Sequence, residues 1–286
     1  MTPYEFKVSV CCVAYNQEKL IVPAIESFLM QQTTFNFEIL IGDDCSTDST
    51  REVIAGYCSK YPDKIKLVSG KTNVGLVRNL SRVMKHAKGE YIALCDGDDY
   101  WTDPLKLQKQ VDFLSQNLQY VVCCHYSKVV DAEDRLLNVE KRPVSFEYTY
   151  DDILIGRKKE CRTSTIMVRN NEQTIQLTEQ EWYKRVQSHS RFFLLFNTFV
   201  TQLKVYVLPE VMAAYRIHDD GIWSLKDSNF KKSKMLGDFK IMLDIFKSSS
   251  AQKRQLLYIY LKSYFLFDLK GFKFKSSVNT IYSLLQ

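Results

Sequence analysis

Short apolar runs alternate with amphipathic segments along the first 118 residues of the chain. Each run is short enough for one buried strand and ends on polar residues. The runs cover residues 7–14, 37–42, 64–68 and 90–95. The segments between them carry apolar residues at helical intervals, over residues 20–32, from Ser49 to Tyr57 and over residues 76–88. Strands that alternate with helices at this spacing predict βαβ units, a mostly parallel sheet and right-handed crossovers.

Capping signals predict where the helices begin and end. Ser49 and Glu52 have the spacing of a capping box at a helix start. Asp103 and Pro104 are typical of an N-cap followed by a proline in the first turn. Gly89 has the position of a residue that follows a helix C-cap.

The pattern is less regular beyond residue 118. Residues 120–130 predict a further strand and residues 131–138 a turn, whereas residues 145–200 show no clear period. Residues 226–286 carry Lys, Phe, Tyr and Leu at helical spacing, which predicts two or three helices. The pattern therefore favours a doubly wound α/β unit followed by a helical extension.

Composition limits the class of protein. The chain has 286 residues, 45% of them hydrophobic and 25% charged, which is typical of a globular protein and excludes disordered or collagen-like classes. No apolar run reaches the roughly 20 residues that a membrane-spanning helix needs. The N-terminus lacks the pattern of a secretory signal, so we expect a cytoplasmic protein. Neighbouring cysteines inside apolar runs, such as Cys11 and Cys12, predict reduced core thiols.

The net charge of +6 is unevenly distributed. Residues 225–286 carry +8, and residues 1–224 carry −2. We expect these two ranges to be the two domains. The basic extension is compatible with peripheral contact to an anionic membrane at the inner leaflet, or with a lysine-rich solvated helix face. No motif for base recognition is present, so nucleic acid is not an expected partner.

Polar clusters follow three of the predicted strands. Tyr15 and Asn16 follow the first strand, Asp43 and Asp44 the second, and Asp96-Gly97-Asp98-Asp99 the fourth. Because ligands of open parallel sheets bind beyond the carboxyl ends of the strands, we expect these clusters to meet in one crevice.

Carboxylates gathered in one crevice repel one another unless a cation compensates them. Oxygen ligands favour Mg²⁺ or Mn²⁺, ions that also bind the phosphates of a substrate, so a nucleoside diphosphate is implied. A turn or helix cap is an equally good interpretation for isolated residues such as Asp48 and Asp103. A cap does not need the three carboxylates of residues 96–99, where Gly97 allows close approach of a ligand to the backbone.

The segments CVAYN, GDDCSTDST, NVGLVRN and GEYIALCDGDD, in this order, resemble the inverting family 2 glycosyltransferases of the GT-A fold. The later segment LPEVMAAYRIHDDGIWS is similar to the end of the catalytic region in bacterial members that build surface polysaccharides. The resemblance covers about residues 6–224. It implies a Rossmann-like GT-A domain, with a mostly parallel sheet and helices on both faces.

The resemblance also implies roles for individual residues. Asp96 and Asp98 correspond to the family's DxD pair, one directed to the ribose and one to the metal. His218 corresponds to a position close to the diphosphate and its metal, with a structural histidine as the alternative. The residues expected at the nucleotide are Ala14, Tyr15, Asn16, Asp43, Asp44, Arg78, Asn79, Asp96 and Gly97, with a solvated helix face as the alternative for Arg78.

The resemblance breaks at the expected general base. Similar sequences carry an aspartate where this chain has Ser190. A serine is not a general base at neutral pH without a partner. Either His189 takes the proton, or an acid such as Glu179 or Glu181 replaces the aspartate, or the chain is inactive, or the alignment is shifted by several residues.

The resemblance implies metal-dependent transfer of a sugar, with inversion, from a nucleotide-diphosphate sugar that is UDP-linked by default. The acceptor class is a glycan or a polyprenyl-linked molecule. A nucleotidyltransferase is the rival enzyme class, but CVAYNQEK lacks its Gly-rich basic loop. The rival outside enzymes is a catalytically impaired nucleotide-sugar-binding relative that acts as a partner in polysaccharide assembly.

Overall fold

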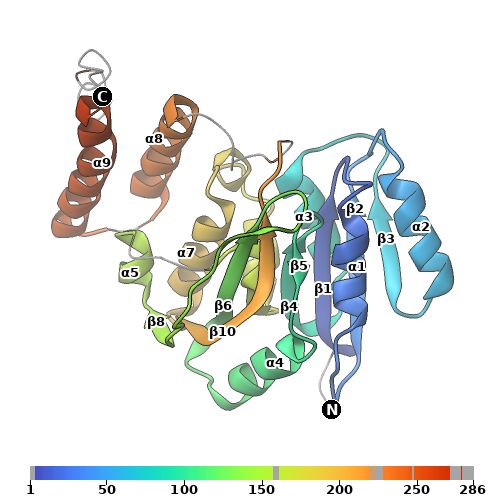
Figure 1. Cartoon of the computed structure of the whole chain (residues 1–286). Helices are drawn as coiled ribbons and strands as arrows, with labels where there is room; N and C mark the ends of the chain where they lie inside the picture. Colours follow the sequence, from blue (N-terminus) through green and yellow to red (C-terminus); the bar gives the residue numbers. More distant parts are fainter. Residues whose placement is uncertain are drawn as a thin grey trace.

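A single mixed sheet forms the centre of the molecule in the computed structural model (Figure 1), which describes residues 4–156, 161–219, 221, 228–246, 248–270 and 278. The strand order is β3-β2-β1-β4-β9-β6-β10-β5, with β7 beside β6 and β8 beside β10. Neighbours among the first four strands are parallel, as are β6 and β10. The short β9 is antiparallel to both β4 and β6. The prediction of a mostly parallel α/β sheet is therefore confirmed.

The strands are β1 (Phe6–Ala14), β2 (Phe37–Asp43), β3 (Ile65–Ser69), β4 (Gly89–Asp96), β5 (Tyr100–Trp101), β6 (Tyr120–Val130), β7 (Leu136–Asn138), β8 (Phe146–Tyr148), β9 (Met167–Arg169) and β10 (Lys204–Arg216). The helices are α1 (Ile21–Leu29), α2 (Thr50–Lys60), α3 (Leu76–Met84), α4 (Lys106–Gln116), α5 (Tyr150–Leu154), α6 (Glu172–Leu177), α7 (His189–Thr201), α8 (Ser228–Ile245) and α9 (Ser250–Lys270). Two 3₁₀ turns lie at Thr163–Thr165 and Tyr183–Arg185.

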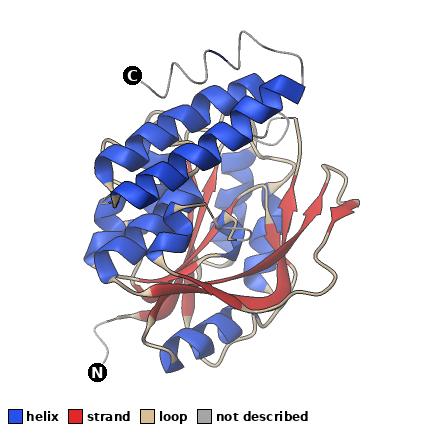
Figure 2. Ribbon diagram, turned by 90° about the vertical axis from the view of Figure 1, so that its left-hand side faces the viewer, coloured by secondary structure: helices blue, strands red, loops and turns tan. Residues whose placement is uncertain are grey.

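Helices cover both faces of the sheet (Figures 1 and 2). Alternate residues of a strand point to opposite faces, so the buried strands supply two separate cores. Val10 and Cys12 of β1 pack with apolar residues of α1 and α4, whereas Cys11 packs with those of α3 and α7. This two-sided burial is why the strands appear as continuous apolar runs in the sequence.

The helix boundaries differ from the capping predictions. Ser49 precedes α2 without a side-chain cap, and Asp48 Oδ1 instead accepts a hydrogen bond from the Thr50 amide at 3.0 Å. Helix α3 ends at Met84, and Gly89 begins β4 rather than following a C-cap. Helix α4 begins at Lys106, so Asp103 lies in the preceding turn.

Two further local differences concern a helix end and a predicted turn, where tertiary contacts can override local sequence preferences. Helix α1 ends at Leu29 instead of continuing to residue 32. The predicted turn over residues 131–138 includes strand β7. No disulfide links any of the eight cysteines, all of which lie in the described residues, as predicted, but Cys45 and Cys58 are only partly buried rather than core residues.

The C-terminal helices α8 and α9 lie side by side (Figures 1 and 2). Phe239, Met242 and Phe246 of the α8 segment and Leu256 of α9 are buried in the same core as α7. The extension is thus helical, as predicted. The boundary predicted between residues 224 and 225, Asp220, Trp223 and most residues after 270 lie outside the described residues. Among the described residues, none of the helices combines the length and apolar character that crossing a membrane requires.

Candidate functional site

The predicted convergence of polar clusters occurs at one edge of the sheet. In the parallel register Ala14 pairs with Asp43, and Val13 pairs with Asp96. The Asp44 amide donates to Ala14 O at 3.0 Å, and the Gly97 amide donates to Val13 O at 2.9 Å. The carboxyl ends of β1, β2 and β4 therefore present their acidic residues side by side.

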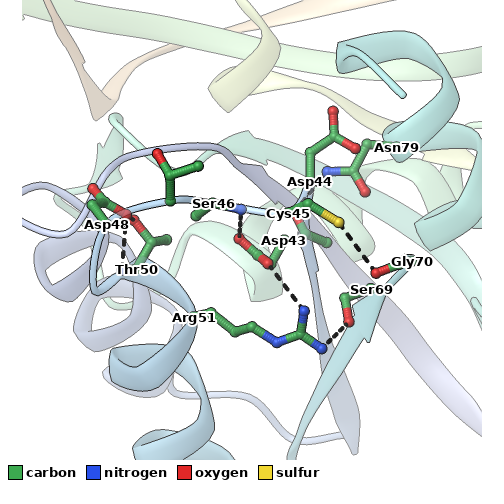
Figure 3. A network of polar contacts seen from close by, with 12 residues as sticks. Asp43, Asp44, Cys45, Ser46, Asp48, Thr50, Arg51, Ser69, Gly70 and Asn79 are labelled. Atoms are coloured by element: carbon green, nitrogen blue, oxygen red, sulfur yellow. Dashed lines mark hydrogen bonds and ion pairs between the residues drawn. The ribbon is translucent and has the colours of Figure 1, made fainter. Parts of the chain in front are cut away.

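Asp43 is fully buried at the end of β2, within the polar network drawn in Figure 3. Its Oδ1 accepts from the Ser46 amide at 3.2 Å, and its Oδ2 lies 3.9 Å from Arg51 Nη1. Arg51 Nη2 also donates to Ser69 Oγ at 2.9 Å. Arg51 thereby connects the ends of β2 and β3. Arg51 was not among the residues predicted for the site, because an arginine on a solvated helix face carries no special signal.

Asp44 holds the loop that precedes α3. Its Oδ1 accepts from the Val74 amide at 2.9 Å, and its Oδ2 accepts from the Gly75 amide at 2.7 Å. Gly75 has a φ of 83°, a left-handed conformation that favours glycine. In this structure both carboxylate oxygens of Asp44 are thus occupied by the backbone. Asp44 therefore sets the start of α3.

The two neighbouring residues of α3 have different environments. Arg78 is exposed. Asn79 is buried, and its Nδ2 donates to the Gly42 carbonyl at 2.7 Å. The Asn79 Oδ1 atom has no hydrogen-bond partner among the described residues. The helix thus presents Arg78 to solvent and uses Asn79 for packing against the end of β2.

The loop after β1 is tied to the loop after β2. Tyr15 is 45% exposed, so its ring is available at the rim. Asn16 has a φ of 52°, and its Oδ1 accepts from the Thr47 amide at 2.8 Å. The nearby Asp48 accepts from the Glu18 and Thr50 amides, at 3.1 and 3.0 Å. For Asp48 the turn interpretation is therefore correct.

The loop at residues 96–99 concentrates acidic groups. Burial and the Asp98 carboxylate raise the pKa of Asp96 to about 7, against the hydrogen bond from Thr163. Burial and the same carboxylate raise the pKa of Asp99 well above its ordinary value. A Cβ at Gly97 would lie 2.4 Å from Gln17 Oε1 and 3.1 Å from Val13 O, so a larger residue would displace the Gln17 side chain and crowd the Val13 carbonyl.

Strand β10 brings distant residues back to this loop. It pairs with β5, with Ala214 opposite Tyr100, and then delivers Arg216 and His218. His218 Nε2 lies 3.0 Å from Asp98 Oδ2. The two side chains are 11% and 22% exposed, so both remain partly accessible to solvent. The predicted proximity of the histidine to the acidic loop is present in the structure.

Arg216 binds the acidic loop at residues 96–99 through its side chain and its backbone amide. Its side chain is only 2% exposed. Nη1 donates to Asp98 O at 3.1 Å, Nη2 donates to Asp134 Oδ1 at 2.7 Å, and the backbone amide donates to Asp99 Oδ1 at 3.0 Å. The guanidinium also lies over the Tyr100 ring, 5.2 Å from its centroid. This role of Arg216 was not predicted, since the pattern of hydrophobic and polar residues does not reveal that an arginine is buried.

The donor set fits a hard divalent cation in part. Asp98 and His218 supply an oxygen and a nitrogen within hydrogen-bond distance of each other. Asp96 adds a carboxyl group whose pKa is raised by burial and by the neighbouring Asp98 carboxylate. In the described residues no set of three or more His, Cys, Asp or Glu side chains is arranged to hold a metal without other ligands. Mn²⁺ and Mg²⁺ commonly use one or two protein groups together with substrate phosphates and water.

Comparison with known proteins identifies the family. The model of glycosyl transferase family 2 matches residues 9–172, which is more than half of the chain. The chain belongs to glycosyl transferase family 2. The resemblance of the sequence motifs to this family is confirmed.

Relatives of this family 2 chain include bacterial proteins. An uncharacterized protein of Mycobacterium tuberculosis is 35% identical over 221 residues, which cover 76% of this chain and 60% of that protein. This chain therefore spans about 60% of the length of that relative. The putative teichuronic acid biosynthesis glycosyltransferase TuaG of Bacillus subtilis is 30% identical over 233 residues, covering 82% of this chain and 88% of TuaG.

Solved structures share the fold of this family 2 chain. TarS of S. aureus, in complex with UDP-GlcNAc, superposes with a TM-score of 0.68 at 20% identity, over 96% of this chain and 79% of that one. The mannosyltransferase PcManGT from Pyrobaculum calidifontis, in complex with GDP-Man and Mn²⁺, gives 0.60 at 16% identity, over 99% and 75%. The likeness confirms the GT-A type of fold.

The segment with the expected base begins α7. His189 is the first residue of the helix, and Ser190 is the second. Burial lowers the pKa of His189 to about 4. The His189 ring packs edge-on against Tyr183, with centroids 5.8 Å apart. Burial raises the pKa of Tyr183, and the negative charge of Asp96 adds to the effect, which connects this segment with the acidic loop.

Helix α8 contacts the residues that precede α7. Asp238 is 2% exposed, and its carboxylate accepts from the Gln187 amide at 2.7 Å and from the Ser188 amide at 2.9 Å. Burial raises the pKa of Asp238, partly opposed by these hydrogen bonds. This contact was not predicted from the sequence, because it joins elements about 50 residues apart.

The two acids considered as replacement bases lie elsewhere. Glu179 forms an ion pair with Lys85, and Glu181 forms one with Lys184. Their side chains are 46% and 80% exposed. Neither has a described contact with the acidic loop at residues 96–99.

Proposed function

We propose that this chain transfers a sugar from a nucleoside diphosphate sugar to a hydroxyl group of a glycan or polyprenyl-linked acceptor, with inversion at the anomeric carbon. The observation that carries the proposal is the meeting of Asp43, Asp96 and Asp98 with His218 at one edge of the sheet. Membership of family 2 and the names of the relatives support the same reaction class.

A UDP-linked donor is proposed as the substrate. One supporting relative is the E. coli enzyme WfaP, named a UDP-Glc:alpha-D-GlcNAc-diphosphoundecaprenol beta-1,3-glucosyltransferase, which is 38% identical over 109 residues. In our proposal Ala14, Tyr15, Asn16, Asp43 and Arg78 face the nucleoside. Asp44 and Asn79 serve this pocket indirectly, because their described contacts fix the backbone around it.

Asp98 and His218, with Asp96 beside them, are the proposed protein ligands of Mn²⁺ or Mg²⁺. When bound, such an ion supplies positive charge that stabilises the departing diphosphate. The chain's own residues orient this pair, since Arg216 fixes the Asp98 carbonyl and His218 lies against the Asp98 carboxylate. The bare backbone of Gly97 leaves room for the Gln17 and Ile21 side chains beside this loop.

The proposed chemical step is a single displacement. The acceptor oxygen forms a bond to the anomeric carbon while the bond between that carbon and the diphosphate oxygen breaks. The acceptor proton moves to a base, and the nucleoside diphosphate leaves with the bonding electrons. We propose His189 as this base. Its imidazole is neutral at pH 7, and its pKa of about 4 gives it the basicity of an ordinary aspartate.

Ser190 favours a second candidate function. If the serine replaces the only effective base, the chain is a catalytically impaired nucleotide-sugar-binding partner in polysaccharide assembly. Both proposals require binding of the nucleotide, and only the first requires turnover.

Calorimetry with UDP, in the presence and absence of Mn²⁺, tests the shared part of the two proposals. Hydrolysis of a panel of UDP-sugars by the wild-type chain, by His189→Ala and by Ser190→Asp then separates them. Transferase function predicts wild-type turnover that falls at least 100-fold in His189→Ala. Turnover that arises only in Ser190→Asp supports the binding protein. Absence of UDP binding refutes both.

The basic C-terminal helices are a proposed peripheral membrane contact. Lys240, Lys253 and Arg254 are exposed on α8 and α9. Such a contact would bring the crevice to a polyprenyl-linked acceptor. Co-sedimentation with phosphatidylglycerol vesicles tests it, and binding that is equal for neutral vesicles would contradict an electrostatic contact.

A further inference from the structure

A basic pocket lies between α3 and the edge strand β3, and none of the residues proposed for the donor site lines it. It has a volume of about 440 Å³. Its lining includes the cationic side chains of Lys66, Arg82 and Lys88 and the imidazole of His86, and none of the residues that line it is acidic. Leu40 and Val68 form part of its apolar lining. A pocket of this size accommodates a small organic molecule rather than a single ion.

Arg82 has the most unusual position in this pocket. Its Nη1 atom is buried without a hydrogen-bond partner among the described residues. Buried donors are nearly always paired in native proteins, so an unpaired one requires an explanation. The other cations have acidic neighbours outside the lining, because Lys66 Nζ lies 3.6 Å from Glu38 Oε2 and Lys88 Nζ lies 2.6 Å from Glu5 Oε2. No ion pair involves the Arg82 guanidinium among the described residues.

The backbone leaves space for the Arg82 guanidinium at one position. A Cβ at Gly70 would lie 2.8 Å from Arg82 Cζ, Nη1 and Nη2. The guanidinium thus rests against the bare backbone of Gly70. This contact fixes a planar group of hydrogen-bond donors beside the pocket, which is the geometry that binds phosphate or carboxylate oxygens in pairs.

We propose that this pocket binds a phosphate monoester of about the size of a sugar phosphate. Arg82 binds the phosphate oxygens, Lys66 and Lys88 add positive charge, and the apolar wall contacts the organic part. The ligand is distinct from the donor diphosphate, because Asp43, Asp96 and Asp98 lie at the carboxyl ends of the strands. Ser69 lines the pocket and also accepts from Arg51, so the two sites are neighbours.

Isothermal titration calorimetry with glucose 1-phosphate, on the full chain at fixed ionic strength, tests the proposal. Arg82→Gln is expected to weaken binding at least tenfold. Gly70→Ala keeps every charge but displaces the guanidinium, and we expect a similar loss. Lys60→Gln removes an exposed cation outside the pocket and serves as the matched control, with an affinity within twofold of wild type. Thermal unfolding verifies that each variant folds.

Three further measurements identify the ligand source and separate this site from the donor site. Inorganic phosphate is expected to bind more weakly than glucose 1-phosphate, and phosphatidylglycerol vesicles are expected not to compete with it. Asp98→Asn should retain glucose 1-phosphate binding whatever its effect on UDP. Unchanged affinity in both Arg82→Gln and Gly70→Ala, competition by the vesicles, or complete displacement by UDP would overturn the proposal.

Discussion

Lys106 gives a sharp test of how burial acts on this fold. Its side chain is fully buried at the start of α4, and Nζ has no hydrogen-bond partner among the described residues. The ammonium lies over the Trp101 ring, 3.8 Å from its centroid. Burial lowers the pKa of Lys106 from 10.5 to about 7. We predict that Lys106→Met stabilises the protein at pH 7.

The magnitude follows from the pKa. A decrease of about 3.5 units costs the folded state about 4 kcal/mol at pH 7, at about 1.36 kcal/mol per unit. The contact with Trp101 returns about 2 kcal/mol when it is desolvated. The net penalty that methionine removes is therefore about 2 kcal/mol, with about 4 kcal/mol as the upper limit. In thermal unfolding of a chain of 286 residues, a net penalty of about 2 kcal/mol corresponds to an increase in Tm of roughly 3–4 °C.

The sign of the pH dependence is part of this prediction. Because the folded pKa lies below the unfolded value, the unfolded chain binds more protons between about pH 7 and 10.5. Wild-type stability should therefore rise with pH through this window. In Lys106→Met this contribution is absent. The difference in unfolding free energy between the two proteins should therefore fall below about 1 kcal/mol at pH 10.

Urea unfolding followed by circular dichroism, at several values between pH 7 and 10, measures both effects. Lys253→Met is the matched control, because Lys253 is an exposed lysine in the first turn of α9, and its effect should stay within about 0.5 kcal/mol. A Lys106→Met protein that is less stable than wild type at pH 7, or a difference in unfolding free energy that is constant with pH, would contradict this prediction.

Three other substitutions test the site. Asp238→Ala removes the acceptor for two amides at the start of α7, so thermal unfolding should show a loss of about 2–4 kcal/mol, and an unchanged Tm would contradict the contact. Asp44→Ala should cost about 1–3 kcal/mol and accelerate amide exchange at Val74 and Gly75, whereas unaltered exchange would count against the tether. His218→Ala should raise the Mn²⁺ concentration needed for half-maximal donor hydrolysis at least tenfold, and an unchanged Mn²⁺ titration would exclude it as a ligand.

The first half of the fold was predictable because its strands are buried on both faces. Such strands are continuous apolar runs, and the rule for open parallel sheets then places the polar residues that follow them at one edge. Asp43 and Asp96 are neighbours across β1 in the register for this reason. Helix ends were less predictable, since Asp48 competes with Ser49 for the start of α2.

The rest of the site depends on contacts that local patterns do not contain. Residues 145–200 form short elements whose burial is decided by distant partners, as with the Tyr183 ring against His189. A buried arginine and an exposed one look alike in sequence, so Arg216 was not singled out. Asp238 in a lysine-rich segment gave no indication that it holds the start of α7.

The late position of strand β10 in the sequence determines when the proposed cation site can be completed during synthesis of the chain. His218 meets Asp98 across 120 positions of the chain, and Arg216 reaches Asp99 across 117. A nascent polypeptide that ends before β10 can already pair β1, β2 and β4, yet it lacks one half of the proposed cation site. Ribosome-bound intermediates of this length would therefore contain the acidic rim without the histidine that completes it.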